Sequence, residues 1–528
     1  MKLLNNPFIL SLLSGLLLTL SYPFTGSLTP LVFIAWVPLF LVASALKTAR
    51  RSVLKIFSYS FIAFLLYNVG TTWWIWNSTD MGAILAFLVN SLLMSGAFTL
   101  GFALFRAPRF SKLHSKDLSL YIGLALMWVI FEFAHFRWEL SWPWLTLGNV
   151  FSLQPSWVQW YEYTGVLGGT VWVLAVNILV TMMVRSKERN FKMLITIASA
   201  LVVPILISLF ILSRVTLEDS KGKYQNVAII QPNIDPYTEK FSQNSEVQLK
   251  RILSLASPYM QSETLILGPE TALQEVFSKS TFNQTQTSKE LNQLVSMHNV
   301  RFLLGASTFE WFKESHSPAS KPIPNVGGFV EYYNSSLYIS RQQTDLIHKS
   351  KLVLGVEKIP FSSMFPFLES LSIDNGGTSG SLGTDTEPKV FEDGNKIYAP
   401  VVCYESIYGA FVGEQCNKGA ELLCIITNDG WWGNTPGHRQ HNQFAALRAI
   451  ETRKFVVRSG NTGISSVWSP DGQCQKQLAY GKVGVIAAKV PLLTGKTFYV
   501  QYGDYLGWLS MVGLMVLLGY GFWVRRRK

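Results

Sequence analysis

The sequence predicts a membrane protein of two parts: a polytopic α-helical domain with about eight transmembrane helices, and an α/β domain outside the cytoplasm. Three observations support this fold class. The 528-residue chain is 49% hydrophobic and only 15% charged, which is too apolar for an ordinary soluble enzyme. Long apolar stretches recur through the first 214 residues. After them the composition changes abruptly to short β-branched runs separated by Pro, Gly, Asn and Ser.

The apolar stretches have the length and composition of membrane-spanning helices. They cover residues 8–22, 28–46, 54–75, 82–105, 117–134, 163–184, 193–213 and 505–524. Only Lys2 precedes the first stretch, no small-residue cleavage site follows it, and another span comes directly afterwards. We therefore interpret it as a membrane helix and not as a cleaved signal peptide. The predicted domains are a helical membrane domain over 1–214, a soluble domain over 222–495 and a last membrane helix over 505–524.

Basic side chains alternate between the predicted loops. Four Lys or Arg residues occupy each of the loops 47–55, 106–116 and 185–192, and the chain ends in Arg-Arg-Arg-Lys. The alternate loops contain one basic residue between them, Arg137. The positive-inside rule places the basic loops and both termini in the cytoplasm. The 222–495 domain is then expected in the periplasm of a bacterial inner membrane. The net charge of +12 follows from topology and does not indicate a nucleic-acid partner.

Short apolar runs in the soluble segment are predicted to be buried strands. They are "NVAIIQPN" (226–233), "ETLILGPE" (263–270), "RFLLGAS" (301–307), "IYAPVVCYE" (397–405) and "ELLCIITND" (421–429). Helical patterns lie between several of them, at 245–257 and 288–300. Strands that alternate with helices favour an α/β sandwich, and the length suits one domain.

Candidate catalytic side chains follow these strands, where the reactive groups of α/β sheets gather. "TLILGPE" ends at Glu270, "APVVC" ends at Cys403, and "DLIHKSKLVLGVEKIPF" contains Lys349 and Glu357. A cysteine nucleophile needs a base for its proton and a cation for the thiolate and the oxyanion. Glu, Lys and Cys supply these roles. Each residue also has an ordinary interpretation alone: a packed thiol, a helix-cap or surface carboxylate, and a solvated lysine.

A metal site is not predicted. The sequence has no C-x-x-C pair and no H-E-x-x-H motif, and four cysteines do not make a disulfide framework. His438 and His441 are three residues apart, but no third ligand is evident, so we interpret them as ordinary polar residues of a helix. Whether Cys416, Cys424 or Cys474 form a disulfide is left open.

Together the local strings resemble the three catalytic motifs of the nitrilase (carbon–nitrogen hydrolase) superfamily. They are "LGPETAL", the Lys349 segment and "VVCYES". That superfamily uses a Glu-Lys-Cys triad on an α-β-β-α fold, so the resemblance implies a nitrilase-like sandwich. The flanking spans, with "FIAWVPLFLV", "SWPWLTLGN", "QPNID" and "NDGWWG", narrow the resemblance to the apolipoprotein N-acyltransferases. The likeness covers nearly the whole chain.

The resemblance implies roles for individual residues. Glu270 is expected to be the general base, Lys349 the oxyanion-stabilising cation and Cys403 the nucleophile. The expected catalytic support residues are Glu357, Tyr404 and Glu405. The expected substrate-binding residues are Trp431, Trp432 and Phe241, of which Phe241 stands where the family has Trp. The ordinary interpretation of Trp431 and Trp432 is core packing.

One motif departs from the family pattern. The family reads K-x-x-L-V-P-F-G-E, whereas this chain reads "KSKLVLGVE". The spacing from Lys349 to Glu357 is kept, but the proline-led turn is lost, so the shape of this loop is open. Lys351 is an alternative catalytic lysine; the position of Lys349 in the motif favours Lys349.

The resemblance also implies the reaction. The expected function is N-acylation of the N-terminal diacylglyceryl-cysteine of apolipoproteins, the last step of lipoprotein maturation, through a thioester on Cys403. The expected donor is a phospholipid, phosphatidylethanolamine by preference. No metal or other cofactor is expected, and the chain is expected to act as a monomer in the bilayer.

Two alternative functions remain. The first is a membrane-anchored amidase with water as acceptor, which would need only one anchor. The second is a transporter or scaffold with an inactive nitrilase-like domain. Eight spans and aromatic strings such as "WWIW" favour lipid handling. A transport path usually carries intramembrane charges, and only Glu132 stands out, near the end of a span.

Overall fold

The computed structural model describes residues 6–106, 117–186, 191–217, 222–240, 242, 244–361 and 381–526. The chain divides into two compact units, and each is described by itself. The helical unit comprises Met1–Trp76, Asp80–Arg214 and Tyr502–Lys528. The sandwich unit comprises Asn77–Thr79 and Val215–Gln501.

Strands of the sandwich unit form an eight-stranded and a six-stranded sheet within the described part of the chain. The larger sheet has the order β14-β1-β2-β4-β6-β5, with β3 beside β4 and β7 beside β6. The smaller has the order β13-β12-β11-β10-β9-β8. The strands are β1 (Tyr224–Gln231), β2 (Leu265–Leu267), β3 (Leu273–Phe277), β4 (Arg301–Phe312), β5 (Lys321–Pro322), β6 (Phe329–Ile339), β7 (Thr344–His348), β8 (Phe391–Asp393), β9 (Lys396–Val402), β10 (Leu422–Thr427), β11 (Phe455–Gly460), β12 (Ser465–Trp468), β13 (Cys474–Leu478) and β14 (Gly484–Pro491).

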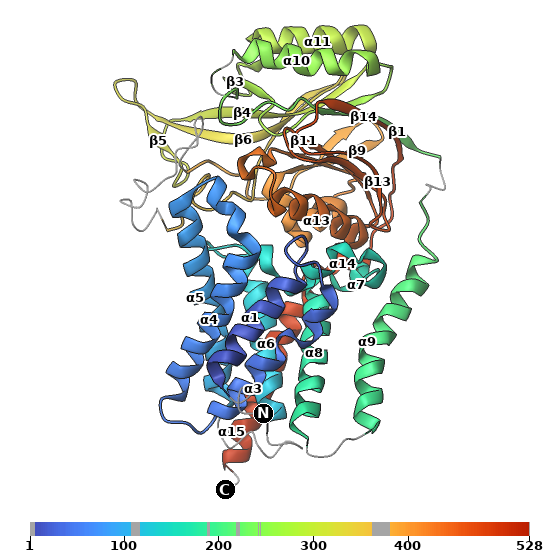
Figure 1. Ribbon diagram of the computed structural model, residues 1–528. Helices are drawn as coiled ribbons and strands as arrows, with labels where there is room; N and C mark the ends of the chain where they lie inside the picture. Colours follow the sequence, from blue (N-terminus) through green and yellow to red (C-terminus); the bar gives the residue numbers. More distant parts are fainter. Residues whose placement is uncertain are drawn as a thin grey trace. The chain divides into compact units, whose positions relative to one another are not determined.

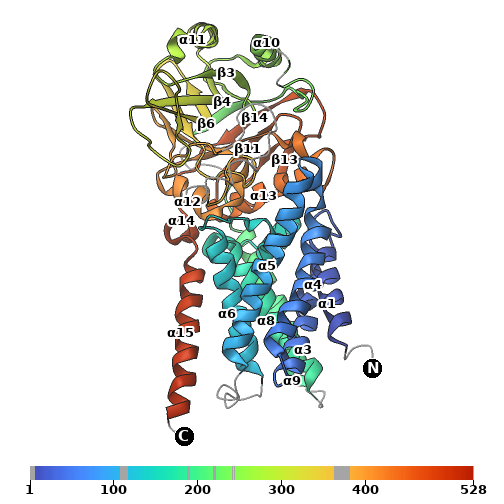
Figure 2. The same ribbon diagram turned by 90° about the vertical axis from the view of Figure 1, so that its left-hand side faces the viewer.

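Helices cover the outer faces of the two sheets (Figures 1 and 2). They are α10 (Ser245–Ala256), α11 (Gln286–His298), α12 (Gly409–Asn417) and α13 (Pro436–Thr452). The short helix α14 (Phe498–Tyr502) follows β14 in the chain. α10 and α11 lie over the larger sheet, whereas α12 and α13 pack on β9, β11 and β12 of the smaller sheet. The predicted α-β-β-α sandwich is therefore confirmed.

Alternation along β1 explains why this strand is apolar throughout. Val227 and Ile229 enter the core between the sheets, while Ala228 and Ile230 enter the core under α10 and α11. A strand buried on both faces needs apolar residues at successive positions. Its parallel neighbour β2 repeats the pattern, and each of the five apolar runs named above contains a strand.

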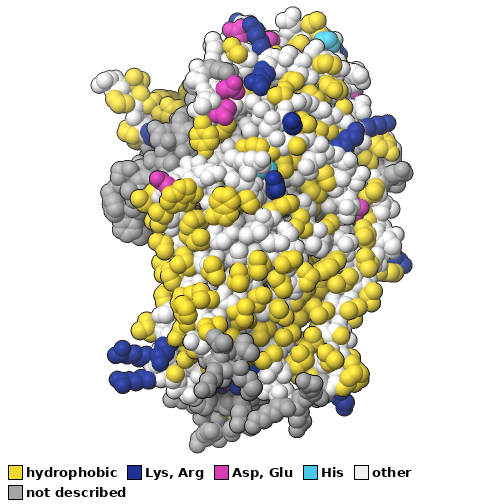
Figure 3. All heavy atoms as spheres, viewed as in Figure 1, with side chains coloured by type: hydrophobic (Ala, Val, Ile, Leu, Met, Phe, Trp, Pro, Cys, Tyr) yellow, Lys and Arg dark blue, Asp and Glu magenta, His cyan; other side chains and the backbone are white. Residues whose placement is uncertain are grey.

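The helical unit consists mainly of helices, most of which are long and apolar. They are α1 (Pro7–Ser21), α2 (Val32–Ala35), α3 (Val37–Leu46), α4 (Ser52–Thr72), α5 (Asp80–Phe105), α6 (Leu118–His135), α7 (Tyr161–Thr164), α8 (Val166–Arg185), α9 (Phe191–Leu212) and α15 (Tyr505–Arg526). Among the described residues, seven helical stretches are long and apolar enough to cross a membrane, and α1 is a shorter apolar helix. Figure 3 shows hydrophobic side chains over a broad band of the helical unit. The predicted polytopic helical domain is confirmed.

Close approach of α1 and α4 depends on a glycine. A Cβ atom added at Gly15 would lie 2.5 Å from the Ala63 carbonyl oxygen and 3.0 Å from the Leu66 Cβ. Small residues let helices approach closely in a membrane, where packing and not hydrophobicity drives their association.

Basic loops meet at one end of the helical unit. Asp117 accepts a hydrogen bond from Lys47 at 3.0 Å and also pairs with Arg185, so the loops after α3 and α8 converge on the start of α6. Arg106, at the end of α5, donates to Ser52 at the start of α4.

Glu132 is a buried carboxylate of α6 that accepts hydrogen bonds from three neighbouring groups. It accepts hydrogen bonds from Trp128 Nε1 at 2.8 Å, from the Leu147 backbone N–H at 2.9 Å and from Thr170 Oγ1 at 2.6 Å. These bonds fasten α6 to α8 and to the segment around Leu147. Donors satisfy both carboxylate oxygens, and these hydrogen bonds explain why a carboxylate can be buried at this position. The position therefore gives no support to a transport path.

Candidate active site

Glu270, Lys349 and Cys403 lie together in the sandwich unit. Glu270 follows β2, Lys349 follows β7, and Cys403 directly follows β9. Their exposed fractions are 8%, 1% and 8%. Buried ionisable groups are costly unless they pair, so a cluster of this kind needs internal partners.

The Lys349 ammonium lies between two carboxylates. Its Nζ is 3.1 Å from Glu270 Oε1 and 2.9 Å from Glu357 Oε1. Asn334, in the middle of β6, donates from Nδ2 to Glu270 Oε1 at 2.7 Å and to Glu357 Oε1 at 3.0 Å. The backbone N–H of Asn428 donates to Glu270 Oε2 at 3.1 Å. The Glu270 carboxylate is therefore fixed through both oxygens.

The turn before Glu357 closes without the family's proline. Glu357 N donates to the Val353 carbonyl at 2.9 Å, and Gly355 N donates to the Lys358 carbonyl at 2.8 Å. Gly355 has φ of 81°, a conformation that glycine adopts without steric cost. Glu357 Oε2 also accepts the Val353 N–H at 2.8 Å, so the carboxylate and its own turn hold each other in place.

Electrostatics give the three groups different protonation states at neutral pH. Burial opposes ionisation of Glu270, but Lys349 and Lys240 outweigh it and lower the pKa of this carboxyl. Burial works against the Lys349 charge, but Glu270 and Glu357 raise the pKa of this lysine well above its usual value. Burial and then Glu270 raise the pKa of the Cys403 thiol. The cluster holds a carboxylate, an ammonium and a neutral thiol.

Cys403 has an uncommon backbone conformation. Its φ is 51°, in the left-handed region, and the 3₁₀ turn Cys403–Ile407 begins at this residue. For a residue with a Cβ this costs about 1–3 kcal/mol and persists only where the surroundings impose it. The sharp turn after β9 presents the thiol at the strand end, which the sequence pattern does not reveal.

Glu405 ties the Cys403 turn to the Lys349 segment. Its Oε2 accepts the Val402 N–H at 2.7 Å, and its Oε1 accepts the Ser350 N–H at 2.6 Å and the Lys351 N–H at 3.3 Å. Burial raises the pKa of Glu405 to about 7, even though these N–H groups lower it.

Replacing Glu405 with glutamine is expected to lower activity at least tenfold and the free energy of unfolding by about 1–3 kcal/mol, because the amide NH₂ must face a buried N–H donor. Thermal unfolding and an assay of the acyl transfer expected from the sequence measure the two effects. Glu414→Gln on α12 is the control, since that side chain lies outside the cluster. Equal activity of Glu405→Gln and wild type would contradict this role.

A hydrogen-bonded network supports the Cys403 turn from α13. His441 Nε2 lies 3.1 Å from the Cys403 carbonyl oxygen and 2.9 Å from Ser406 Oγ, and His441 Nδ1 lies 2.8 Å from Asp429 Oδ1. Arg458 donates to Asp429 Oδ2 at 2.5 Å. His441 lies on a helix, as predicted, but it is buried in this network beside the Cys403 turn.

The same residues bring ligand-type atoms of Cys403, Asp429 and His441 within 4.8 Å of one another. This donor set does not suit a metal ion. Both His441 nitrogens face hydrogen-bond partners, and the Arg458 guanidinium occupies the other Asp429 oxygen and repels a cation. The other histidine of the pair, His438, packs its ring against Tyr480 with centroids 4.4 Å apart, so it does not join the cluster.

Aromatic residues lie around the cluster. Tyr404 is buried against Tyr408, with ring centroids 5.4 Å apart. Trp432 meets the ring of His441 edge-on at 5.6 Å, and the half-buried Trp431 meets Tyr237 edge-on at 5.2 Å. The last candidate substrate-binding residue, Phe241, lies outside the described residues.

Several partners of the cluster are absent from the sequence-based prediction. They are Lys240, Asn334, Asn428, Asp429 and His441. Asn334 carries a usable signal, because an amide inside the predicted strand run "EYYNSSLYI" needs a hydrogen-bond partner when the strand is buried. The others stand in loops or on a helix, and only the fold brings them to Cys403. All four cysteines lie in the described part of the chain and are free thiols, which settles the open question about pairing.

Comparison with known proteins agrees with this fold. Residues 226–497 match the family model for carbon-nitrogen hydrolases, and residues 14–179 match the model for the apolipoprotein N-acyltransferase N-terminal domain. The protein is thus a membrane-bound member of the nitrilase, or carbon–nitrogen hydrolase, superfamily. The apolipoprotein N-acyltransferase of Chlorobaculum tepidum is 30% identical over 98% of this chain and 97% of its own length. That of Geobacter metallireducens is 25% identical over 99% and 96%.

The chain belongs to the apolipoprotein N-acyltransferase family. It is an acyltransferase, and the family assigns it to N-acylation of lipoproteins. Among solved structures, an amidase from Nesterenkonia sp. is 15% identical, with a TM-score of 0.36 over 53% of this chain and 93% of the amidase. Saccharomyces cerevisiae Nit3, of the nitrilase superfamily, is 16% identical, with a TM-score of 0.36 over 51% and 91%.

Proposed function

We propose that the enzyme transfers a fatty acyl group from a membrane phospholipid, through a thioester on Cys403, to the α-amino group of a diacylglyceryl-cysteine. The observation that carries the proposal is the buried arrangement of Glu270, Lys349 and Cys403 in a chain of this family. A carboxylate beside a neutral thiol supports general-base activation, and the adjacent ammonium supports stabilisation of an oxyanion. The apolar helical unit supports a lipid donor, with phosphatidylethanolamine as the expected headgroup.

The first half-reaction forms the thioester. Glu270 takes the proton from Cys403 as the sulfur attacks the ester carbonyl carbon of the phospholipid. The oxyanion of the tetrahedral intermediate is stabilised by Lys349 and by backbone N–H groups of the turn that begins at Cys403. When the intermediate collapses, the C–O ester bond breaks and Glu270 returns the proton to the leaving oxygen. The products are a lysophospholipid and acyl-Cys403.

The second half-reaction forms the amide. The neutral α-amine of the diacylglyceryl-cysteine attacks the thioester carbonyl, and Glu270 accepts a proton from the attacking nitrogen. The C–S bond then breaks, and the thiol of Cys403 regains its proton. Because a thioester also reacts with water, burial of the cluster favours transfer over hydrolysis.

The test supplies the purified enzyme with phosphatidylethanolamine labelled in its acyl chains and with a diacylglyceryl-cysteine peptide. The proposal predicts N-acyl peptide and lysophospholipid in equal amounts, with little free fatty acid. Release of free fatty acid without peptide acylation would instead support a water-dependent hydrolase.

The proposed topology predicts that Cys474 faces the periplasm. Cys474 on β13 is exposed, whereas the other three cysteines are buried. A membrane-impermeant maleimide should therefore label wild-type enzyme in intact spheroplasts, and Cys474→Ser should lose the label. A cysteine introduced at Arg51 of the Cys474→Ser variant should react only after the membrane is permeabilised. Labelling of Cys474 only after permeabilisation would reverse the topology.

A further inference from the structure

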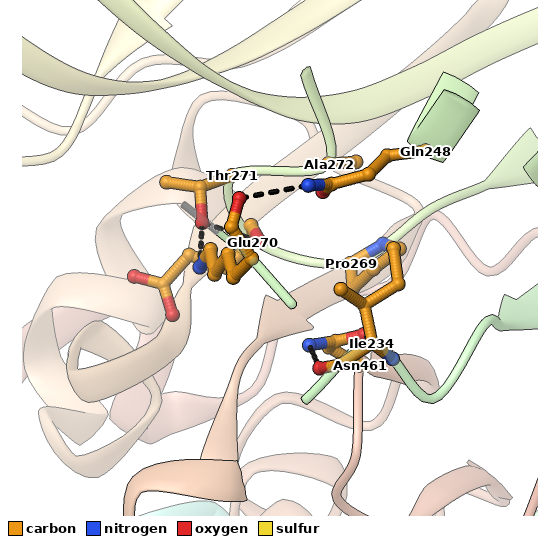
Figure 4. Close-up of a pocket in the computed structure, with 8 residues that line it drawn as sticks. Ile234, Gln248, Pro269, Glu270, Thr271, Ala272 and Asn461 are labelled. Atoms are coloured by element: carbon orange, nitrogen blue, oxygen red, sulfur yellow. Dashed lines mark hydrogen bonds between the residues drawn. The ribbon is translucent and has the colours of Figure 1, made fainter. Parts of the chain in front are cut away.

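Lys240 is a buried lysine beside the candidate base that no motif identifies. Its side chain has an exposed fraction of 5%, and its ammonium donates a hydrogen bond to Thr271 Oγ1, on the residue after Glu270. The ammonium also lies 5.8 Å from the ring centroid of Trp431. Lys240 and Glu270 line one small pocket, in which Figure 4 shows Glu270 and Thr271 as neighbours.

The backbone around Lys240 is held by a folded turn. Its N–H donates to the Asp235 carbonyl at 2.9 Å, and its own carbonyl accepts from Gln248 Nε2 at 2.7 Å. The Asp235 side chain accepts the N–H groups of Tyr237 and Thr238, both at 2.8 Å. The backbone of Lys240 is thus fixed on both sides of the residue, and its buried side chain is unlike that of a solvated surface lysine.

The Lys240 ammonium changes the balance of positive and negative charges in the cluster. Lys349 contacts both Glu270 and Glu357, and Lys240 interacts electrostatically with Glu270, Lys349, Cys403 and Glu357. The neighbouring Glu405 is held by backbone N–H groups, and Asp429 is paired with Arg458 and His441. Without Lys240, the buried Glu270 carboxylate and the half-buried Glu357 carboxylate would share one ammonium, and carboxylates that share a site keep a proton on one member. With Lys240, their charges are balanced.

We propose that Lys240 is a further active-site cation that keeps Glu270 ionised as the base for Cys403. The inference rests on the proposed function of Glu270. Lys240 acts through Glu270 and is a positioning residue.

Charge balance persists through the reaction. When Glu270 takes the thiol proton, its negative charge passes to the sulfur and then to the oxyanion, so Glu357 and the oxyanion face Lys349 and Lys240. Burial lowers the pKa of Lys240 to about 8, although Glu270 and Cys403 oppose this. The lysine is therefore charged at pH 7 and loses its proton on the alkaline side. The cation is thus present across the acidic range, in which Glu270 would otherwise take up a proton.

The test measures single-turnover acylation of Cys403 by phosphatidylethanolamine from pH 5 to 9. Lys240→Met removes the charge, and Lys240→Arg keeps it. Lys454→Met is the matched control, because Lys454 is equally buried in the sandwich unit but donates to the Leu493 and Gly495 carbonyls. Thermal unfolding confirms that each variant is folded.

Lys240→Met should move the acidic limb of the profile upward by at least about one pH unit, since a nearby opposite charge shifts a carboxyl pKa by about 1–3 units. The loss of acylation rate relative to wild type should therefore be largest at pH 5 and should shrink as the pH rises. Lys240→Arg and Lys454→Met should keep the wild-type limb. A folded Lys240→Met variant with the wild-type limb would overturn the inference.

A second readout separates this inference from the proposed function. Alkylation of Cys403 by iodoacetamide, followed by peptide mass spectrometry, needs no lipid and depends on the same ionisations. If wild type forms no thioester, the proposed function fails, and the alkylation profile still decides the inference. An upward shift of the acidic limb in Lys240→Met supports it, and an unchanged limb overturns it.

Discussion

Replacing Cys403 with alanine is expected to abolish acyl transfer, with a loss of at least about 10⁴-fold, because no other group of the cluster can carry the acyl chain. The fold should persist. Alanine and cysteine both have a Cβ, so the strain at φ 51° is unchanged. Acylation of a diacylglyceryl-cysteine peptide, followed by mass spectrometry, measures the loss.

Cys424→Ala is the matched control for this variant. Cys424 is a buried free thiol of the same inter-sheet core, in the middle of β10. Its replacement should lower the free energy of unfolding by about 1 kcal/mol and leave acyl transfer within about twofold of wild type. Substantial transfer by a folded Cys403→Ala variant would show that the acyl group does not pass through this sulfur.

Replacing Lys349 with methionine is expected to have the second largest effect. Glu270 and Glu357 would then face each other without the ammonium between them, and removal of one partner from a buried ion pair costs about 3–5 kcal/mol. Acyl transfer should fall at least about 10³-fold, since both the oxyanion cation and the ionised state of Glu270 are lost. Thermal unfolding and the peptide assay measure the two losses.

The pH dependence of stability distinguishes this variant from wild type. In wild type the pKa of Glu270 is lowered, so its contribution is present above its ordinary pKa and is lost as the pH falls. In Lys349→Met, repulsion would raise the pKa of one carboxyl, so stability would be highest at low pH and would fall as the pH rises through the raised value. Between pH 5 and 8 the Glu270 contribution should therefore stay constant in wild type, whereas the unfolding temperature of Lys349→Met should fall as the pH rises.

Lys351→Met serves as the control, because Lys351 is the other lysine of the motif. Its ammonium lies 5.5 Å from the ring centroid of Tyr408. This variant should keep most of the wild-type activity and the wild-type pH trend. If Lys351→Met is inactive and Lys349→Met is active, the two lysines must exchange roles.

Local patterns in the sequence are sufficient to predict the architecture. The strand at β1 and the helix at α10 follow from burial periodicity, which depends on residues near in sequence. The position of Glu270, Lys349 and Cys403 near one another follows from a general rule about strand ends and from the resemblance of the motifs.

The environment of the thiol depends on residues far apart in sequence. His441 reaches the Cys403 carbonyl from a helix 38 residues away, and Lys240 meets the residue after Glu270 from 31 residues before it. The left-handed conformation of Cys403 is likewise imposed by its neighbours, because cysteine has no preference for it. Such features depend on tertiary contacts, so no local sequence pattern predicts them.

The most direct test of the central claim is the intact mass of the purified enzyme after incubation with phosphatidylethanolamine. The account predicts one added fatty acyl group on wild type and none on Cys403→Ala. Neutral hydroxylamine should remove it, and so should a diacylglyceryl-cysteine peptide, with one N-acylated peptide formed for each group lost. An enzyme that acylates the peptide without ever carrying the acyl mass, or whose acyl group the peptide does not discharge, would contradict the account.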